Sequence, residues 1–167
     1  MIRQHYKAET YRARDSVGFL IKRAYALMLD NLEPGFSRRG FTFMQWVVLM
    51  QLRSGLALNL RDISSQFCHD SGALTRVVDQ LVERGLVERQ RAAQDRRKVD
   101  LHLTRAGLKR CEELIPLVVG KLNRALAEFS RPELAELIRL LYKFNTGLQS
   151  EIERESAQVE PALRVRS

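Results

Sequence analysis

The chain has 167 residues, of which 45% are hydrophobic and 29% charged, and this balance excludes a disordered protein and predicts a globular one with a core of its own. Lysine and arginine (28) outnumber aspartate and glutamate (20), and the resulting net charge of +8 predicts a polyanionic partner, either a nucleic acid or an anionic membrane. No apolar run reaches the roughly 18 residues that span a bilayer, and the start of the chain lacks the apolar core of a signal peptide, so we expect a cytoplasmic protein without a membrane partner.

The residues that usually build metal, disulfide and catalytic sites show no such pattern here. The two cysteines, Cys68 and Cys111, lie in helical patterns without a C-x-x-C pair, which argues against a disulfide framework and a zinc ribbon. The three histidines are scattered, and the sequence has no G-x-S-x-G, phosphate-loop or H-E-x-x-H motif. We therefore expect no metal, no cofactor and no enzymatic activity.

The first predicted helix covers about residues 15–32, where apolar residues recur at helical spacing. Pro34-Gly35 is expected to end it, because proline and glycine both interrupt helices. After a polar connector, Thr42 forms a capping box with Gln45 and opens a second helix, which ends before Gly55.

A helix-turn-helix unit follows. Asn59 with Asp62 indicates the start of a short third helix. A tight turn at 69–72 leads into a fourth helix that begins near Ser71, and two short helices joined by such a turn form this unit. Gly85 is well placed as the left-handed residue that ends the fourth helix.

Strand alternation on both sides of a polar segment predicts a two-stranded wing. The first strand begins at Leu86, and the second carries Val99, Leu101 and Leu103 on one face. Residues 90–97 between them are too polar to pack, so they should form a projecting loop.

Two long helices complete the chain. Over about residues 105–129 the apolar residues keep the spacing of a helix packed along another helix, and Pro116 predicts a kink. Ser130 and Glu133 form another capping box, which opens the last helix. The tail after Ser156 lacks periodicity, and we expect it to be frayed.

These elements predict a mainly α fold with a small β-wing, in which a winged helix-turn-helix domain is flanked by N- and C-terminal dimerisation helices. The apolar stripes of the first and last helices look too long for the winged lobe to cover, so we predict a homodimer in which they pack against a second copy. The expected boundaries are a single domain over 15–152, with the winged lobe at 36–104, the dimerisation helices at 15–35 and 105–152, and terminal extensions at 1–14 and 153–167.

Three stretches of the sequence carry a resemblance to a known family. They are Thr42-Phe43-Met44-Gln45-Trp46-Val47-Val48-Leu49, then Gly72-Ala73-Leu74-Thr75-Arg76 with Gly85-Leu86-Val87-Glu88-Arg89, and last Asp95-Arg96-Arg97 with Leu101-His102-Leu103-Thr104. The first is similar to the pattern T-x-x-Q-[WF]-x-V-L, and the last to the wing signature D-x-R…L-x-L-T, of the MarR family of winged helix-turn-helix regulators. The resemblance implies a dimeric transcription regulator of the repressor type that binds double-stranded DNA at an inverted-repeat operator.

The polar face of the fourth helix predicts the contact with the major groove. Thr75 and Arg76 lie on it, and a guanidinium can bind guanine O6 and N7 with two hydrogen bonds. Ser71 and Ala73 are close enough to the helix N-terminus for backbone N–H groups to meet a phosphate and for a small side chain to touch a thymine methyl. The alternative is a solvated helix face with Ser71 as its cap.

Basic residues also cluster on the wing, where the alternative is again a solvated surface. The resemblance implies that Arg97 enters the minor groove, and that Asp95 orients the wing through Arg89. Arg96 and Lys98 are expected to touch phosphates, which supply salt-dependent affinity without sequence information.

The resemblance further implies a small effector, often an aromatic or phenolic anion, bound between the dimerisation helices and the DNA-binding lobe. The residues expected to line that cleft are Arg23, Tyr25, Met28, Met44 and Trp46, with core packing as the alternative for each. Such a ligand would favour a dimer whose recognition helices are wrongly spaced for successive major grooves.

A different class of function stays open at this point: a basic winged-helix module that binds RNA, or an assembly surface without a transcriptional role. Base recognition by a helix in the major groove distinguishes a DNA-binding regulator from an RNA-binding module, because the major groove of A-form RNA is too deep and narrow for side chains to read.

Overall fold

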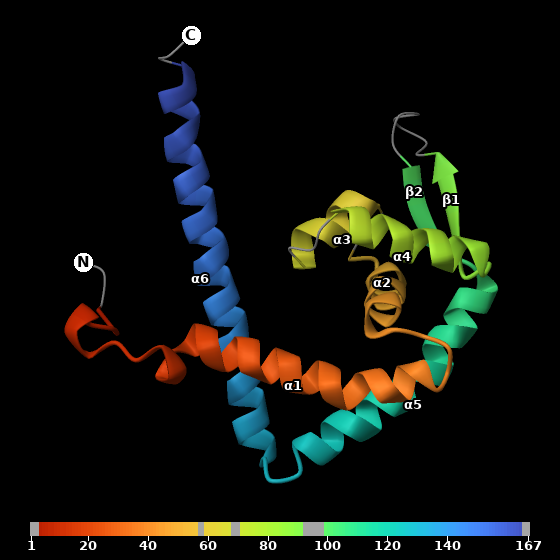
Figure 1. Ribbon diagram of the computed structural model, residues 1–167, viewed down its shortest axis with the longest axis horizontal. Helices are drawn as coiled ribbons and strands as arrows, with labels where there is room; N and C mark the ends of the chain where they lie inside the picture. Colours follow the sequence, from red (N-terminus) through yellow and green to blue (C-terminus); the bar gives the residue numbers. More distant parts are fainter. Residues whose placement is uncertain (1–3, 57–58, 68–70, 92–98, 165–167) are drawn as a thin grey trace. The chain divides into compact units, whose positions relative to one another are not determined.

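The computed structural model describes residues 4–56, 59–67, 71–91 and 99–164 (Figure 1). The chain divides into two compact units, residues 1–121 and 122–167. The helices and the two-stranded sheet confirm the predicted mainly α fold with a small β-wing. In chain order the elements are η1 (Ala8–Thr10), η2 (Ala13–Asp15), α1 (Val17–Ser37), α2 (Phe43–Ser54), α3 (Leu60–Phe67), α4 (Ser71–Glu83), β1 (Val87–Arg91), β2 (Val99–Leu103), α5 (Arg105–Ala125) and α6 (Arg131–Arg164).

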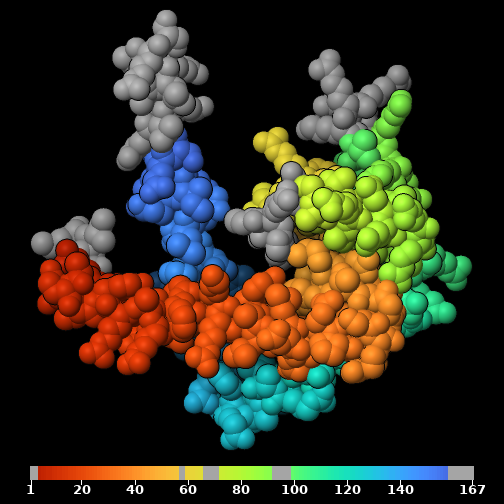
Figure 2. Space-filling model, in the orientation of Figure 1, coloured from red at the N-terminus to blue at the C-terminus, as the bar shows by residue number. Residues whose placement is uncertain are grey.

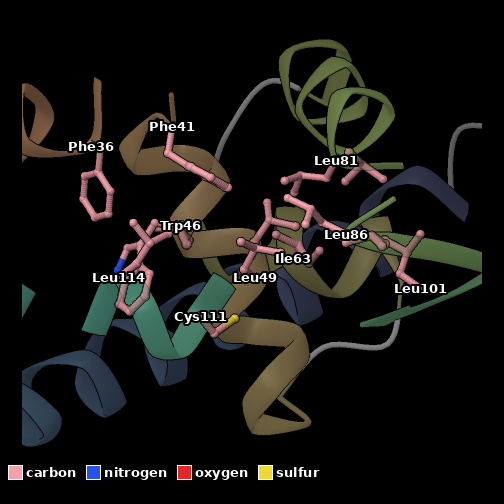
Figure 3. Close-up of a cluster of buried hydrophobic side chains, with 14 of the residues drawn as sticks. Phe36, Phe41, Trp46, Leu49, Ile63, Leu81, Leu86, Leu101, Cys111 and Leu114 are labelled. Carbon is pink, nitrogen blue, oxygen red and sulfur yellow. The ribbon is translucent and has the colours of Figure 1, made fainter. Parts of the chain in front are cut away.

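One apolar core holds the first unit together (Figure 3). Phe36 from the end of α1 packs beside Trp46 of α2, with ring centroids 5.8 Å apart. Helices α3, α4 and α5 and both strands add side chains to the same cluster. The buried apolar residues are Leu32, Phe36, Phe41, Trp46, Val47, Val48, Leu49, Ile63, Leu74, Val78, Leu81, Leu86, Val87, Leu101, Cys111 and Leu114.

The predicted starts of α2 and α3 are confirmed by their hydrogen bonds. The Gln45 backbone N–H donates to Thr42 Oγ1 at 3.2 Å, and the Thr42 N–H donates to Gln45 Oε1 at 3.1 Å, which completes the capping box. Asn59 Oδ1 accepts from the Asp62 N–H at 3.0 Å. At the other end of α2, Gly55 has a φ of +69°, the left-handed conformation expected of its cap.

The end of α4 and the wing also follow the prediction. Gly85 has a φ of +66°, and the N–H of Leu86 donates to the Leu81 carbonyl at 2.9 Å, as in a Schellman cap. Strands β1 and β2 then pair antiparallel, with Val87 opposite Leu103. The predicted start of the loop at residue 90 is wrong, because Gln90 and Arg91 still belong to β1 and pair with Asp100 and Val99. Residues 92–97 of the predicted loop lie outside the described residues.

The predicted end of the first helix is wrong, because α1 continues through Pro34 to Ser37. A proline inside a helix removes one backbone hydrogen bond and costs about 3 kcal/mol. Two interactions offset that cost here. The Phe36 side chain is fully buried, and Glu33 Oε2 accepts the N–H of Phe43 at 2.9 Å, which connects the last turn of α1 to the start of α2. Gly35 faces α5 so closely that a Cβ atom there would lie 2.7 Å from a methyl carbon of Leu117.

Two further boundaries differ at the C-terminal end. Helix α5 runs through Pro116 and ends at Ala125 rather than near residue 129. After Ala125 the chain forms a turn, in which the Phe129 N–H donates to the Leu126 carbonyl at 2.9 Å. The expectation of a frayed tail after Ser156 is also wrong, since α6 continues to Arg164.

Among the described residues, α1 and α6 carry most of the exposed large apolar side chains. The N-terminal half of α1 exposes Val17, Phe19, Leu20, Ile21, Tyr25 and Leu27. In the second unit, α6 exposes Leu137, Ile138, Leu140, Leu141, Tyr142, Phe144, Leu148 and Ile152. Even so, none of the helices in the described ranges combines the length and the hydropathy that crossing a membrane requires.

Thr104 joins α4, the wing and α5. Its N–H donates to the Leu86 carbonyl at 3.1 Å, and its hydroxyl donates to the Gly85 carbonyl at 2.7 Å. The same hydroxyl accepts the N–H of Gly107 at 3.0 Å, which caps α5. Gly107 is buried against the Leu86 carbonyl, and a Cβ atom on it would lie within 3.0 Å of that backbone.

Replacing Gly107 with alanine should therefore destabilise the protein by about 3 kcal/mol, because backbone rather than a flexible side chain occupies the space. Gly147→Ala is the control, since nothing lies within 4 Å of a Cβ at that helical position, and alanine should be neutral or stabilising there. Urea denaturation measures both changes. Equal midpoints for the two variants would contradict the close approach of α5 to the wing base.

Candidate nucleic-acid interface

Helix α4 has one buried and one exposed face. Leu74, Val78 and Leu81 are buried at helical spacing and fix which way the helix faces. The predicted contact residues Ala73, Thr75 and Arg76 are exposed on the other face, and Ser71 is the first residue of the helix. In Figure 1, α4 and the wing strands lie at the same end of the winged lobe.

A groove between α3 and α4 adds residues that the sequence reasoning missed. It has a volume of about 490 Å³ and is lined by Leu60, Arg61, Ser64, Ser65, Leu74 and Thr75. Arg61 and Ser65 are exposed, and cations and hydroxyls are groups that bind phosphates. Arg61 and Ser65 lie four residues apart and so share one face of α3, and this spacing is the signal that could have identified them.

The base of the wing is attached to α4 by an ion pair. Arg89 on β1 places Nη2 2.5 Å from Oδ1 of Asp79 on α4, and the two side chains are 39% and 43% exposed. Because both partners are this exposed, the pair orients the wing more than it stabilises the fold. A hollow of about 660 Å³ lies beside it, lined by Asn59, Leu60, Arg61, Asp62, Arg89, Val99 and Leu101.

Of the predicted contact between Asp95 and Arg89, only Arg89 lies in the described part of the chain. Arg89 contacts α4 through Asp79, a partner that the sequence reasoning did not name. Asp95 and the predicted DNA contacts Arg96, Arg97 and Lys98 lie outside the described residues, so their roles stay predictions.

The residues predicted to line an effector cleft fall into two groups. Arg23 and Tyr25 are exposed on α1, and the Tyr25 ring is 6.5 Å from the ring of Phe43. Met28 and Met44 are partly buried against the core, and Trp46 is buried in it (Figure 3). Met28, Met44 and Trp46 therefore show core packing, whereas Arg23 and Tyr25 do not; an effector role for the five residues stays a prediction.

Cys111 is a core residue, as predicted. It is fully buried in α5, and burial raises the pKa of its thiol above the ordinary value, which keeps it in the unreactive thiol form. Within the described ranges, no group of three histidine, cysteine, aspartate or glutamate side chains could hold a metal ion.

Known proteins match this arrangement. A family model described as the MarR family matches residues 41–99. The multiple antibiotic resistance protein MarR of Escherichia coli is 35% identical over 103 residues, which are 61% of this chain and 72% of that protein. The chain belongs to the MarR family.

Relatives with related names and structures agree with the assignment. A crystal structure of an Escherichia coli MarR mutant complexed with operator DNA is 30% identical, with a TM-score of 0.66 over 77% of this chain and 92% of that one. A Bordetella bronchiseptica BpsR structure, which concerns regulation of DNA binding by 6-hydroxynicotinic acid, is 27% identical, with a TM-score of 0.70 over 81% and 96%. The homoprotocatechuate degradative operon repressor of Escherichia coli is 22% identical over 78% of this chain and 88% of its own length.

This MarR-family chain is a DNA-binding transcriptional regulator with a winged helix, as the sequence resemblance implied. The matched range, 41–99, contains every residue predicted to touch DNA. The family is one of transcriptional regulators rather than of enzymes.

Proposed function

We propose that this chain binds an inverted-repeat operator as a homodimer and represses transcription, with a small molecule controlling its hold on DNA. The observation that carries the proposal is the exposed face of α4, where Ala73, Thr75 and Arg76 project opposite a buried apolar face. A helix of this shape fits the major groove of B-form DNA, where each base pair presents a distinct pattern of donors and acceptors.

Each group in the interface has a separate task under this proposal. Arg76 reads a base edge, and Thr75 contacts a base or a phosphate. Arg61 and Ser65 of α3 hold the phosphate backbone, as the first helix of a helix-turn-helix does. Arg97 enters the flanking minor groove, where a narrow groove attracts arginine.

A second copy of the chain would cover the exposed apolar faces of α1 and α6. Eight large apolar side chains of α6 are exposed, among them Ile138 at 47% and Leu148 at 49%, which is far more apolar surface than one helix normally leaves in water. A two-fold dimer also matches an inverted repeat, because each copy then reads one half-site.

The names of relatives support repression and control by a ligand. One relative is a repressor of a degradative operon, and another binds DNA under the regulation of 6-hydroxynicotinic acid. A ligand of this aromatic acid class acts here if it binds more tightly to a dimer whose two α4 helices are not about 34 Å apart, the spacing of successive major grooves.

Substituting the two arginines tests the DNA contacts. On a duplex enriched by the protein from a randomised library, Arg76→Ala should reduce base discrimination by about 1–3 kcal/mol, and Arg97→Ala should weaken binding strongly while helical content stays unchanged. Lys109→Ala removes an exposed charge of α5 as the control. Fluorescence anisotropy measures affinity, and unchanged affinity for Arg97→Ala would reject the wing assignment.

The same assay with an RNA duplex tests the other class of function. If the wild-type protein bound the RNA duplex as tightly as the enriched DNA duplex, the RNA-binding alternative would be favoured.

A charge placed on the apolar face of α6 tests the dimer. Ile138→Glu should raise the dimer dissociation constant by about 100-fold, because it buries an unpaired carboxylate. Lys143→Glu reverses a charge on the same helix, away from Ile138, and should leave the dimer intact. Sedimentation equilibrium measures both, and a monomeric wild-type protein would overturn the homodimer.

Thermal melting tests the ligand. A panel of small aromatic acids that begins with 6-hydroxynicotinic acid should include one that raises the midpoint by mass action and releases the enriched duplex. Cyclohexanecarboxylate carries the same charge without the aromatic ring and serves as the control. If no aromatic acid shifts the midpoint or releases DNA, control by this class of ligand is rejected.

A further inference from the structure

Gln45 is a polar side chain in the apolar core, and it is only 5% exposed. Its Oε1 accepts the Thr42 N–H at 3.1 Å and Nη1 of Arg84 at 3.3 Å, and its Nε2 donates to Oε1 of Gln80 at 2.9 Å. The direction of the amide follows from these partners, because a flipped amide would point its NH₂ group at two other donors. One side chain thus caps α2 and also holds α4.

Arg84, just after α4, completes the connection. Its Nη1 donates to the carbonyl of Gly40 at 2.9 Å as well as to Gln45. Its guanidinium carbon lies 4.0 Å from the centre of the Phe41 ring, and that ring is 2% exposed within the core cluster (Figure 3). The guanidinium of Arg110 on α5 lies 5.3 Å from the same ring centre. We call Gln45, Gln80, Arg84 and the Gly40 carbonyl the Gln45 network.

The Gln45 network lies on the same side of α4 as a proposed base-reading residue. Arg76, Gln80 and Arg84 follow one another at intervals of four residues, and residues four apart are neighbours along a helix surface. The buried apolar residues of α4 set which face of the helix meets the core, but hydrophobic burial is non-directional and defines the exact rotation less sharply. Hydrogen bonds do have direction, so the Gln45 network restricts rotation of α4 where apolar packing alone would not.

We propose that Gln45 and Arg84 are positioning residues for DNA recognition, which set the rotation of α4 against α2; this rests on the proposed reading of DNA by α4. A rotation of about 20° moves a group about 5–6 Å from the helix axis by about 2 Å. That displacement is enough to break a hydrogen bond to a base edge, whose length must stay near about 2.7–3.2 Å. The same rotation weakens phosphate contacts less than base contacts, because long, flexible side chains bind phosphates through charge more than through a fixed hydrogen-bond direction.

The predicted signature is therefore lost discrimination with retained non-specific binding. The two probes are the duplex that the wild-type protein enriches from a randomised library and a scrambled duplex of the same composition. Arg84→Met keeps the stem over Phe41 and removes the donors, and it should lower the ratio of the two affinities by about tenfold, the order of one mismatched base pair. Gln45→Met should do the same, and because Gln45 is buried its side chain does not touch DNA itself.

Arg38→Met is the matched control. Arg38 is exposed and lies two residues before Gly40 in the chain, but it takes no part in the Gln45 network, so its loss removes one charge and should lower both affinities by the same factor. Circular dichroism and the thermal midpoint are recorded for every variant, and affinities are measured below the lowest midpoint. If one of the two methionine variants fails to fold, the other decides by the same ratio.

The outcomes separate the two proposals. If Arg84→Met and Gln45→Met leave the ratio unchanged while Arg76→Ala lowers it, α4 reads DNA but the Gln45 network does not position it. If no duplex is enriched, or if Arg76→Ala leaves the ratio unchanged, α4 does not read DNA, and the positioning role is rejected together with the proposed function.

Discussion

The hydrogen bonds of Thr104 are the contacts on which the arrangement of the winged lobe depends. This residue ends the wing, binds the carbonyls that follow α4, and caps α5. The segment after α4, the end of β2 and the start of α5 are therefore joined at this one residue. Because Gly107 leaves no space between α5 and the Leu86 carbonyl, a displacement of α5 must be transmitted to the base of the wing.

Helix α4 is held from several directions, and each contact restrains a different movement. Its apolar face seats it on the core, the Asp79–Arg89 ion pair joins it to the wing, and the polar contacts of Gln80 and Arg84 join it to the start of α2. The face that carries Thr75 and Arg76 takes no part in the buried core. Side chains on that face can therefore change without disturbing the core.

Local signals in the sequence were enough to predict most of the helix and strand limits. Thr42 with Gln45, Gly55 and Gly85 each act on residues within one turn, so their effect is visible in a short window of sequence. Pro34 misled for the opposite reason, because the burial of Phe36 and the carboxylate of Glu33 that overrule it depend on other helices. The partners of Gln45 were missed likewise, since Gln80 and Arg84 lie 35 and 39 residues away from it. Asp79 is only ten residues from Arg89, but it lies on α4 and Arg89 on β1, so neither helical nor strand spacing links them.

Helix α1 changes character at Pro34. Before it, the N-terminal half exposes apolar side chains and projects from the lobe (Figure 2); after it, Gly35 and Phe36 lie in the core against α2 and α5. Proline cannot donate the backbone hydrogen bond that would otherwise brace this turn. Helix α1 is therefore most easily bent where it enters the lobe. Because Gly35 is held in close contact with Leu117, the projecting half would bend about this point.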